Sequence, residues 1–146
     1  MTSTVIDASV ALAWCFSDET SAYADAVLVA LEHQQILVPA VWPLEITNAL
    51  AVAERRKRIH QPEILRFVEL LDGLRIRQDS LSVSGSIVEI LPLARMYGLS
   101  AYDAAYLEVA LRHRASLATL DDGLDKACRA EGIEILMRRR PPKAKR

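Results

Sequence analysis

The sequence predicts an α/β fold built on a central, mostly parallel sheet. A buried strand of such a sheet is an unbroken apolar run, and residues 4–6, 36–38 and 117–120 are runs of this kind. Longer stretches with apolar residues every three or four positions separate them, which is typical of helices. Strands that alternate with helices indicate parallel pairing.

The first half of the chain predicts helices that follow each buried strand. Pro39 stops the second strand, Pro43 fits the first turn of a long helix, and Gly73 closes the next helix. The expected elements are a strand at 4–6, helices at 8–16 and 17–33, a strand at 36–38, helices at 41–58 and 61–71, and an edge strand at 74–77.

The second half repeats the alternation. Pro92 is expected to kink or restart a helix that Gly98 closes, and Ser100 caps the next helix with Asp103 three residues later, as in a capping box. The expected elements are helices at 84–97 and 101–113, a strand at 117–120, a helix from 121 to 132 and a last strand at 133–136.

Length and composition fit one globular domain. The chain has 146 residues, of which 51% are hydrophobic and 25% charged. No apolar run reaches the roughly 18 residues that a membrane span needs, and no signal peptide is evident, so a cytoplasmic location is expected. Two cysteines without a CxxC spacing and three scattered histidines predict neither a disulfide framework nor a zinc site.

The end of the chain is strongly basic. Residues 138–146 hold six of the 18 lysines and arginines, which leaves an acidic body. We therefore divide the chain into a domain at 1–137 and a basic, disordered tail at 138–146. The tail could help to hold a polyanion, or it could be a solvated terminus.

Four carboxylates fall where a site is expected. Asp7 and Asp121 each follow a buried strand, Asp103 lies in the first turn of a helix, and Glu45 lies near the start of another. Ligands of open α/β sheets bind at the carboxyl ends of the strands, where these residues can converge. Each also has an ordinary interpretation: Asp7, Asp103 and Asp121 suit helix caps, and Glu45 suits a solvated helix face.

Clustered carboxylates repel one another unless a cation neutralises them. Oxygen ligands without a nearby His or Cys favour Mg²⁺ or Mn²⁺ over zinc. A site of this kind can activate a water and stabilise the leaving oxygen of a phosphodiester.

The ordered segments DAS at 7–9, PAVWPLEITNAL at 39–50, GLSAYDAAYL at 98–107 and LATLD at 117–121 resemble a PIN domain. In detail they are similar to the VapC toxins of prokaryotic type II toxin–antitoxin modules. The resemblance covers nearly the whole chain, to about residue 135. It implies a three-layer α/β/α sandwich and a ribonuclease that depends on Mg²⁺ or Mn²⁺.

The resemblance also implies roles for particular residues. The four family acids are matched by Asp7, Glu45, Asp103 and Asp121, as catalytic residues and metal ligands. We expect Asp7 and Asp103 to bind the metal directly, with Glu45 and Asp121 completing its shell or orienting the attacking water. Further matched positions, expected to hold these groups in place, are Ser9, Asn48 and Thr119. Asp122 and Asp125 are additional carboxylates that make the fourth position the least secure.

The partners that the resemblance implies are an RNA substrate, a cognate antitoxin and a second copy of the chain. Binding to DNA would occur only through the antitoxin, and no membrane is involved. Trp14 and Phe16 suit either an antitoxin surface or the core. The basic residues that could contact phosphate are those at 55–58 and in the tail. A solvated helix end and a disordered tail explain these residues equally well.

Other functions fit less well. A haloacid dehalogenase phosphatase needs a second Asp where Ser9 stands, and a receiver domain needs an acidic pair near the N-terminus. A PIN nuclease that processes RNA without an antitoxin, and an inactive PIN module that only binds RNA or a partner, stay open as alternatives.

Overall fold

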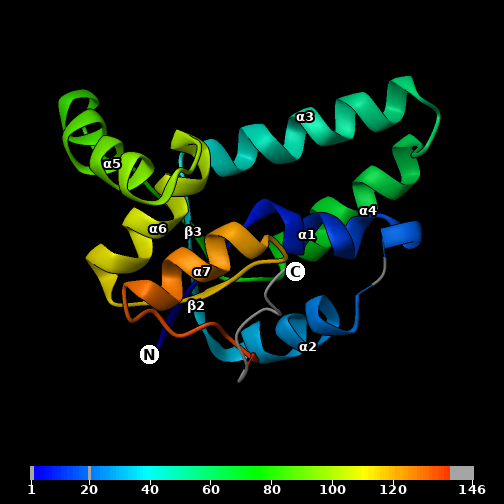
Figure 1. The fold of residues 1–146 in the computed structure, drawn as a ribbon. Coiled ribbons are helices and arrows are strands. Elements are labelled where there is room, and N and C mark those ends of the chain that lie inside the picture. The colour runs from blue at the N-terminus through cyan, green and yellow to red at the C-terminus, as the bar shows by residue number, and fades with distance from the viewer. Residues whose placement is uncertain (1, 20, 139–146) are drawn as a thin grey trace, which may run out of the picture.

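A parallel sheet forms the centre of the molecule (Figure 1). The computed structural model describes residues 2–19 and 21–138. Over these residues the strands are β1 (Ser3–Ile6), β2 (Gln35–Pro39), β3 (Ile76–Asp79) and β4 (Ser116–Ala118), in the order β3-β2-β1-β4. Every neighbouring pair is parallel, as the apolar runs predicted, so all four strands end at the same edge.

Helices flank this sheet, which confirms the predicted PIN-like α/β/α arrangement. Figure 1 shows α5 and α6 together at one end of the molecule, while α1 packs against α3 and α4. The helices are α1 (Ala8–Cys15), α2 (Ala22–Ala30), α3 (Val41–Arg55), α4 (Gln61–Asp72), α5 (Val83–Tyr97), α6 (Ala101–His113) and α7 (Asp122–Ala130).

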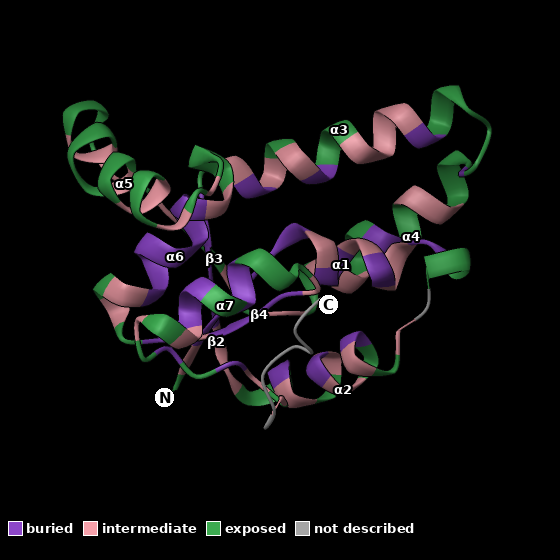
Figure 2. Cartoon of the chain, in the orientation of Figure 1, coloured by how far each residue is buried: buried purple, intermediate pink, exposed green. Residues whose placement is uncertain are grey.

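The helices differ in how deeply they are buried (Figure 2). α6 packs on β1 and β2 and is buried from Ala104 to Ala110. By contrast α5 has no buried residue, although it packs along α6. The core therefore holds α6 in a fixed position, and this also fixes the position of the residues near the start of the helix.

Three predicted elements are wrong in detail. The helix expected at 17–33 is a 3-10 turn, then α2, then another 3-10 turn, because Ser21 supplies a new cap by accepting the Ala24 N–H. Pro92 lies within α5, which continues through it, so the helix does not restart there, and a kink at this residue stays a prediction. The strand expected at 133–136 is reduced, among the described residues, to a single bridge between Leu117 and Ile135.

The end of the described chain returns to the body. Arg138 lies over the ring of Tyr23, 4.2 Å from its centroid, and 3.5 Å from Asp125. The predicted basic tail otherwise lies outside the described residues, so the division at 137 stays a prediction. None of the helices described is long and apolar enough to cross a membrane.

Candidate active site

Asp7 lies at the carboxyl end of β1, the strand between β2 and β4. Its backbone N–H donates to the carbonyl of Ala118 at 3.0 Å, which continues the pairing of β1 with β4. It occupies the N-cap position of α1, yet its side chain makes no capping hydrogen bond, and only 5% of the residue is exposed. Capping therefore does not account for this buried carboxylate.

Two hydroxyl groups hold Asp7. Ser9 Oγ donates to Asp7 Oδ2 at 2.9 Å, and Thr119 Oγ1 donates to the same oxygen at 2.7 Å. The hydroxyls in turn accept backbone N–H groups, Ser9 from Leu120 at 3.2 Å and Thr119 from Asp121 at 2.9 Å. Both hydroxyls donate to Oδ2, and neither engages Oδ1.

Glu45 is the fifth residue of α3. Tyr106 donates its hydroxyl to Glu45 Oε1 at 2.7 Å from α6. Burial and the nearby carboxylate raise the pKa of the Tyr106 hydroxyl, which therefore remains a donor at neutral pH. No sequence pattern predicted this contact, because the two residues are 61 positions apart in the chain.

The remaining two acids stand at helix starts. Ser100 caps α6 by accepting the Asp103 N–H at 3.1 Å, as predicted. Asp121 caps α7 by accepting the Leu124 N–H on Oδ1 at 2.9 Å. A cap engages one carboxylate oxygen and leaves the other, so capping and ligand binding are compatible at Asp121.

The structure brings the four acids together at the strand ends, and we call Asp7, Glu45, Asp103 and Asp121 the acidic edge. Burial raises the pKa of Asp7, Glu45 and Asp103 above their ordinary values. Repulsion adds to this effect: Asp7 and Asp121 act on Asp103, and Asp7 and Asp103 act on Glu45. Among residues 2–19 and 21–138, only neutral hydroxyls and amides oppose the rise in these pKa values, and no Lys or Arg does.

The donor chemistry of the acidic edge suits a hard divalent cation. All its ligand atoms are carboxylate oxygens, with hydroxyls behind them and no His or Cys among them. Within the described residues, no three acidic, His or Cys side chains stand close enough to enclose a metal together. The acids lie within electrostatic range of one another, and their side chains would have to rearrange to enclose a cation.

Other predicted positions have clearer structural roles or stay untested. Asp125 is fully buried and paired with Arg129 Nε at 2.6 Å, so it is a structural acid, while Asp122 is exposed at the start of α7. Asn48 is exposed on α3, one turn after Glu45.

Of the two aromatic candidates for an antitoxin surface, Phe16 lies in the core and Trp14 packs against it. Phe16 is buried against Ala53 and Ile59, and the half-buried Trp14 donates its indole N–H to the carbonyl of Ala24 at 2.8 Å. Packing therefore explains both side chains.

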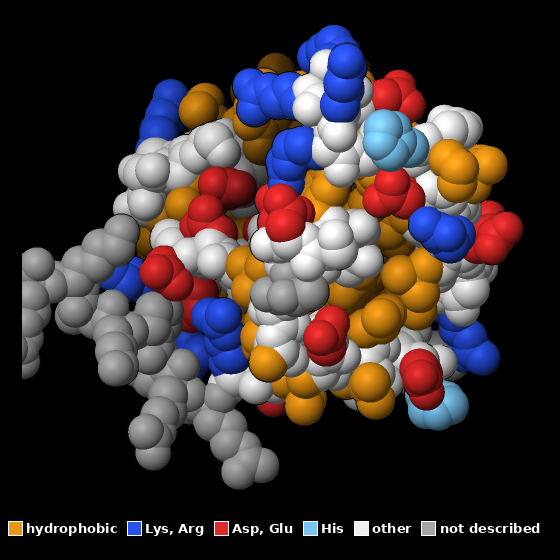
Figure 3. Space-filling view, turned by 90° about the vertical axis from the view of Figure 1, so that its right-hand side faces the viewer, with side chains coloured by type: hydrophobic (Ala, Val, Ile, Leu, Met, Phe, Trp, Pro, Cys, Tyr) orange, Lys and Arg blue, Asp and Glu red, His pale blue; other side chains and the backbone are white. Residues whose placement is uncertain are grey.

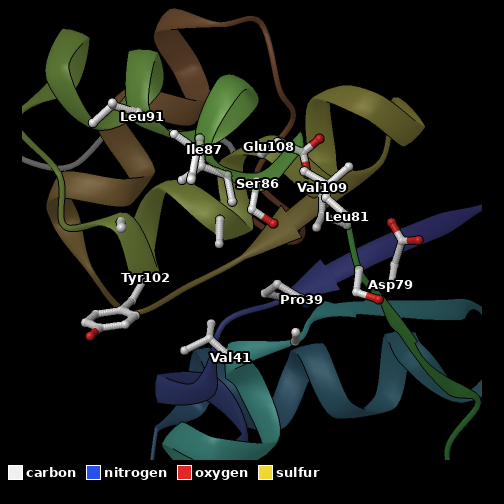
Figure 4. A pocket seen from close by; sticks show the side chains of 15 residues that line it. Pro39, Val41, Asp79, Leu81, Ser86, Ile87, Leu91, Tyr102, Glu108 and Val109 are labelled. Carbon is white, nitrogen blue, oxygen red and sulfur yellow. The ribbon is translucent and has the colours of Figure 1, made fainter. Parts of the chain in front are cut away.

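A mostly apolar pocket of about 430 Å³ lies beside the acidic edge (Figure 4). Ile87 and Leu91 line one side and Pro39 and Val41 the other, and Tyr102, next in sequence to Asp103, also lines it. None of the four acids belongs to this pocket. It continues the apolar face of α5 and is a candidate surface for a partner instead of the site of chemistry.

Positive charge gathers elsewhere on the surface (Figure 3). Lys and Arg side chains cluster at the top of this view, where α3 ends and the chain turns toward α4. Residues 55–58 of this turn are all exposed. Arg58 is engaged with Asp18 at 3.0 Å, which leaves the other three as the candidates for phosphate contact there.

A model of the PIN domain family matches residues 4–130. The fold is similar to PAE2754 from Pyrobaculum aerophilum, with 24% identity, a TM-score of 0.64, and coverage of 86% of this chain and 79% of that one. A toxin–antitoxin complex from Klebsiella pneumoniae is 18% identical with a TM-score of 0.57, over 81% and 86% of the two chains.

A third solved structure is VapBC2 from Rickettsia felis bound to a DNA fragment from its promoter. It is 13% identical, with a TM-score of 0.61 and coverage of 92% of this chain and 97% of that one. At these identities the solved structures support the fold alone. No curated protein matches the sequence.

Proposed function

The chain belongs to the PIN-domain family, and from that membership we propose that it is a Mg²⁺- or Mn²⁺-dependent endoribonuclease that serves as the toxin of a type II toxin–antitoxin module. PIN domains are generally nucleases. The observation that carries the proposal is the acidic edge itself: four carboxylates at one end of the sheet, where no Lys or Arg among the described residues lowers the pKa of Asp7, Glu45 or Asp103. A divalent cation and a phosphodiester supply the charges that such a cluster lacks.

In the proposed reaction Asp7 and Asp103 hold the cation, and Glu45 and Asp121 complete its surroundings or orient the attacking water. When bound, the cation would activate that water and stabilise the leaving oxygen. Ser9 and Thr119 keep the Asp7 carboxylate in one orientation through the hydrogen bonds to Oδ2. In-line hydrolysis of the RNA would leave a 5′-phosphate and a 3′-hydroxyl.

The starts of α1, α6 and α7 also favour this chemistry. Asp7 and Asp121 occupy N-cap positions, and Asp103 lies in a first turn. The positive end of a helix dipole stabilises nearby negative charge, so it offsets part of the repulsion among the acids and attracts a phosphate group.

Two protein partners belong to the proposal. The Klebsiella and Rickettsia structures are a toxin–antitoxin complex and a VapBC complex on DNA, and by analogy we propose a cognate antitoxin that would also provide any DNA binding. A second copy of the chain is the other partner. The exposed apolar side chains of α5, including Val83, Ile87 and Val88, are the surface we expect it to cover.

Expression in a host cell tests the function directly. Wild type is expected to arrest growth and produce new RNA 5′ ends, whereas Asp7→Asn, at matched protein levels, does neither. Equal arrest by both proteins with no RNA cleavage would contradict the nuclease proposal. Cleavage by purified wild type should stop in EDTA and return with Mn²⁺ or Mg²⁺, and cleavage that persists in EDTA would exclude the metal-dependent mechanism.

The gene neighbourhood separates a toxin from an RNA-processing PIN nuclease. A short reading frame that precedes this one, encodes a DNA-binding protein and suppresses the growth arrest when coexpressed supports the toxin. If no neighbouring gene relieves the arrest, the processing nuclease is the better description.

A further inference from the structure

Tyr106 links Glu45 on α3 to α6, the helix that also carries Asp103. It is fully buried on α6, one helical turn after Asp103, and it belongs to the main hydrophobic core. Its hydroxyl reaches out of that core to Glu45 Oε1 on α3. A phenylalanine would fill the same space, so packing alone does not explain the hydroxyl.

The contact has the properties of a fixed support. A phenol that donates to a carboxylate makes a charge-assisted hydrogen bond, which is stronger than one between neutral groups. The ring of Tyr106 cannot move without disturbing the core, whereas Glu45 is a flexible, half-buried side chain. The bond therefore fixes the carboxylate to the ring, and its use of Oε1 leaves Oε2 available.

The geometry points to Tyr106 as a positioning residue that ties Glu45 to the helix bearing Asp103 and thereby prepares the acidic edge for a divalent cation. The inference rests on the proposed function, because it assigns a role in the same metal-dependent site. Tyr106 acts through Glu45 and touches neither the cation nor the RNA. Pre-ordering a ligand in this way lowers the entropy lost on binding, and losing such a support costs roughly 10- to 100-fold in metal affinity.

The test is the Mn²⁺ affinity of the metal-free full chain, measured by titration calorimetry. Tyr106→Phe is expected to weaken Mn²⁺ binding at least about tenfold, with a melting temperature in EDTA within about 4 °C of wild type. The matched control is Tyr97→Phe, which removes a similar bond from Tyr97 to Glu131 away from the acidic edge and should leave the affinity unchanged. An unchanged affinity in Tyr106→Phe would overturn the inference.

A second pair of proteins tests whether Tyr106 acts through Glu45. In a Glu45→Gln background, adding Tyr106→Phe should weaken Mn²⁺ binding by less than about twofold. A full tenfold loss in that background would show a different route and overturn the assigned role. If wild type binds Mn²⁺ but cleaves no RNA, and Tyr106→Phe binds Mn²⁺ more weakly than wild type, the proposed function fails while the positioning role stands. If wild type binds no Mn²⁺, both the proposed function and the positioning role fail.

Discussion

The acidic edge and the acids elsewhere in the chain differ in what neutralises them. Arg112 pairs with Glu108 at 2.7 Å and with Asp79 at 2.7 Å, and Arg129 pairs with Asp125 at 2.6 Å. Arginine side chains of the same chain therefore neutralise these carboxylates. The acids of the acidic edge, by contrast, receive hydrogen bonds only from hydroxyl and amide groups among the described residues.

The pKa shifts reflect this difference. Burial raises the pKa of Asp79, but hydrogen bonds from His113 and Arg112 and their charges bring it below its ordinary value. Burial raises the pKa of Asp7, and the hydroxyls of Thr119 and Ser9 do not offset that rise. An acid paired within the chain contributes to folding, whereas an acid left with neutral donors is suited to an external cation.

The largest expected effect is the loss of cleavage in Asp7→Asn. Removing this charge should slow cleavage of a labelled RNA in Mn²⁺ by about a thousandfold or more, because several kcal/mol of charge stabilisation correspond to that factor. Asn keeps an oxygen that can accept from Ser9 and Thr119, so the fold should persist by circular dichroism. Cleavage within tenfold of wild type would remove Asp7 from the reaction.

Asp125→Asn should have the opposite effect: it should lower stability and leave cleavage nearly unchanged. Removing the charge of this buried carboxylate weakens its ion pairs with Arg129 and Arg138, and we expect the free energy of unfolding to fall by about 2 to 3 kcal/mol. Cleavage per folded molecule should stay within a factor of two. Urea denaturation measures the first quantity, and a loss of cleavage in fully folded protein would mean that Asp125 belongs with the acidic edge.

Thr119→Val tests the hydroxyl support of Asp7. The substitution keeps the shape of the buried side chain but removes its bond to Asp7, and cleavage should fall by roughly 10- to 100-fold. Thr119→Ser keeps the hydroxyl and should retain most of the activity. Equal rates for the two variants would show that the hydroxyl bond does not matter.

The smallest expected effect is on the stability of the metal-free protein, measured in EDTA as the pH is changed. Because the raised pKa of Asp7 means that the folded chain binds its proton more tightly, charging Asp7 lowers stability above that pKa. Asp7→Asn should therefore be more stable than wild type at neutral pH, by about 1 kcal/mol. The advantage should shrink as the pH falls toward the ordinary value of 3.8. Thermal melts of both proteins measure it, and a growing advantage would contradict the shift.

Local patterns in the sequence predicted most of the fold. The apolar runs located β1, β2 and β4, and Ser100 and Gly98 marked the boundary between α5 and α6. The same patterns were less reliable where one cap competes with a long periodic stretch. Ser21 restarts a helix inside residues 17–33, and the hydrophobic period continues through that point.

The convergence of the acids was also predictable, because parallel strands end at a common edge. The side chains that contact these acids could not be predicted from the sequence. Asp125 lies only four residues after Asp121 in the chain. Its ion pairs with Arg129 and Arg138, which only the structure shows, distinguish it from the acids of the acidic edge. The bond from Tyr106 to Glu45 likewise depends on how α6 and α3 pack, which no local pattern records.

The hydroxyls of Ser9 and Thr119 have a further consequence for the dynamics of the site. Each accepts a backbone N–H from the segment after β4, at Leu120 and Asp121, while donating to Asp7. A local opening that exposes these amides to solvent also releases the carboxylate. The rate at which the Leu120 and Asp121 amide protons exchange with deuterium therefore reports how often the acidic edge comes apart while the rest of the sheet stays folded.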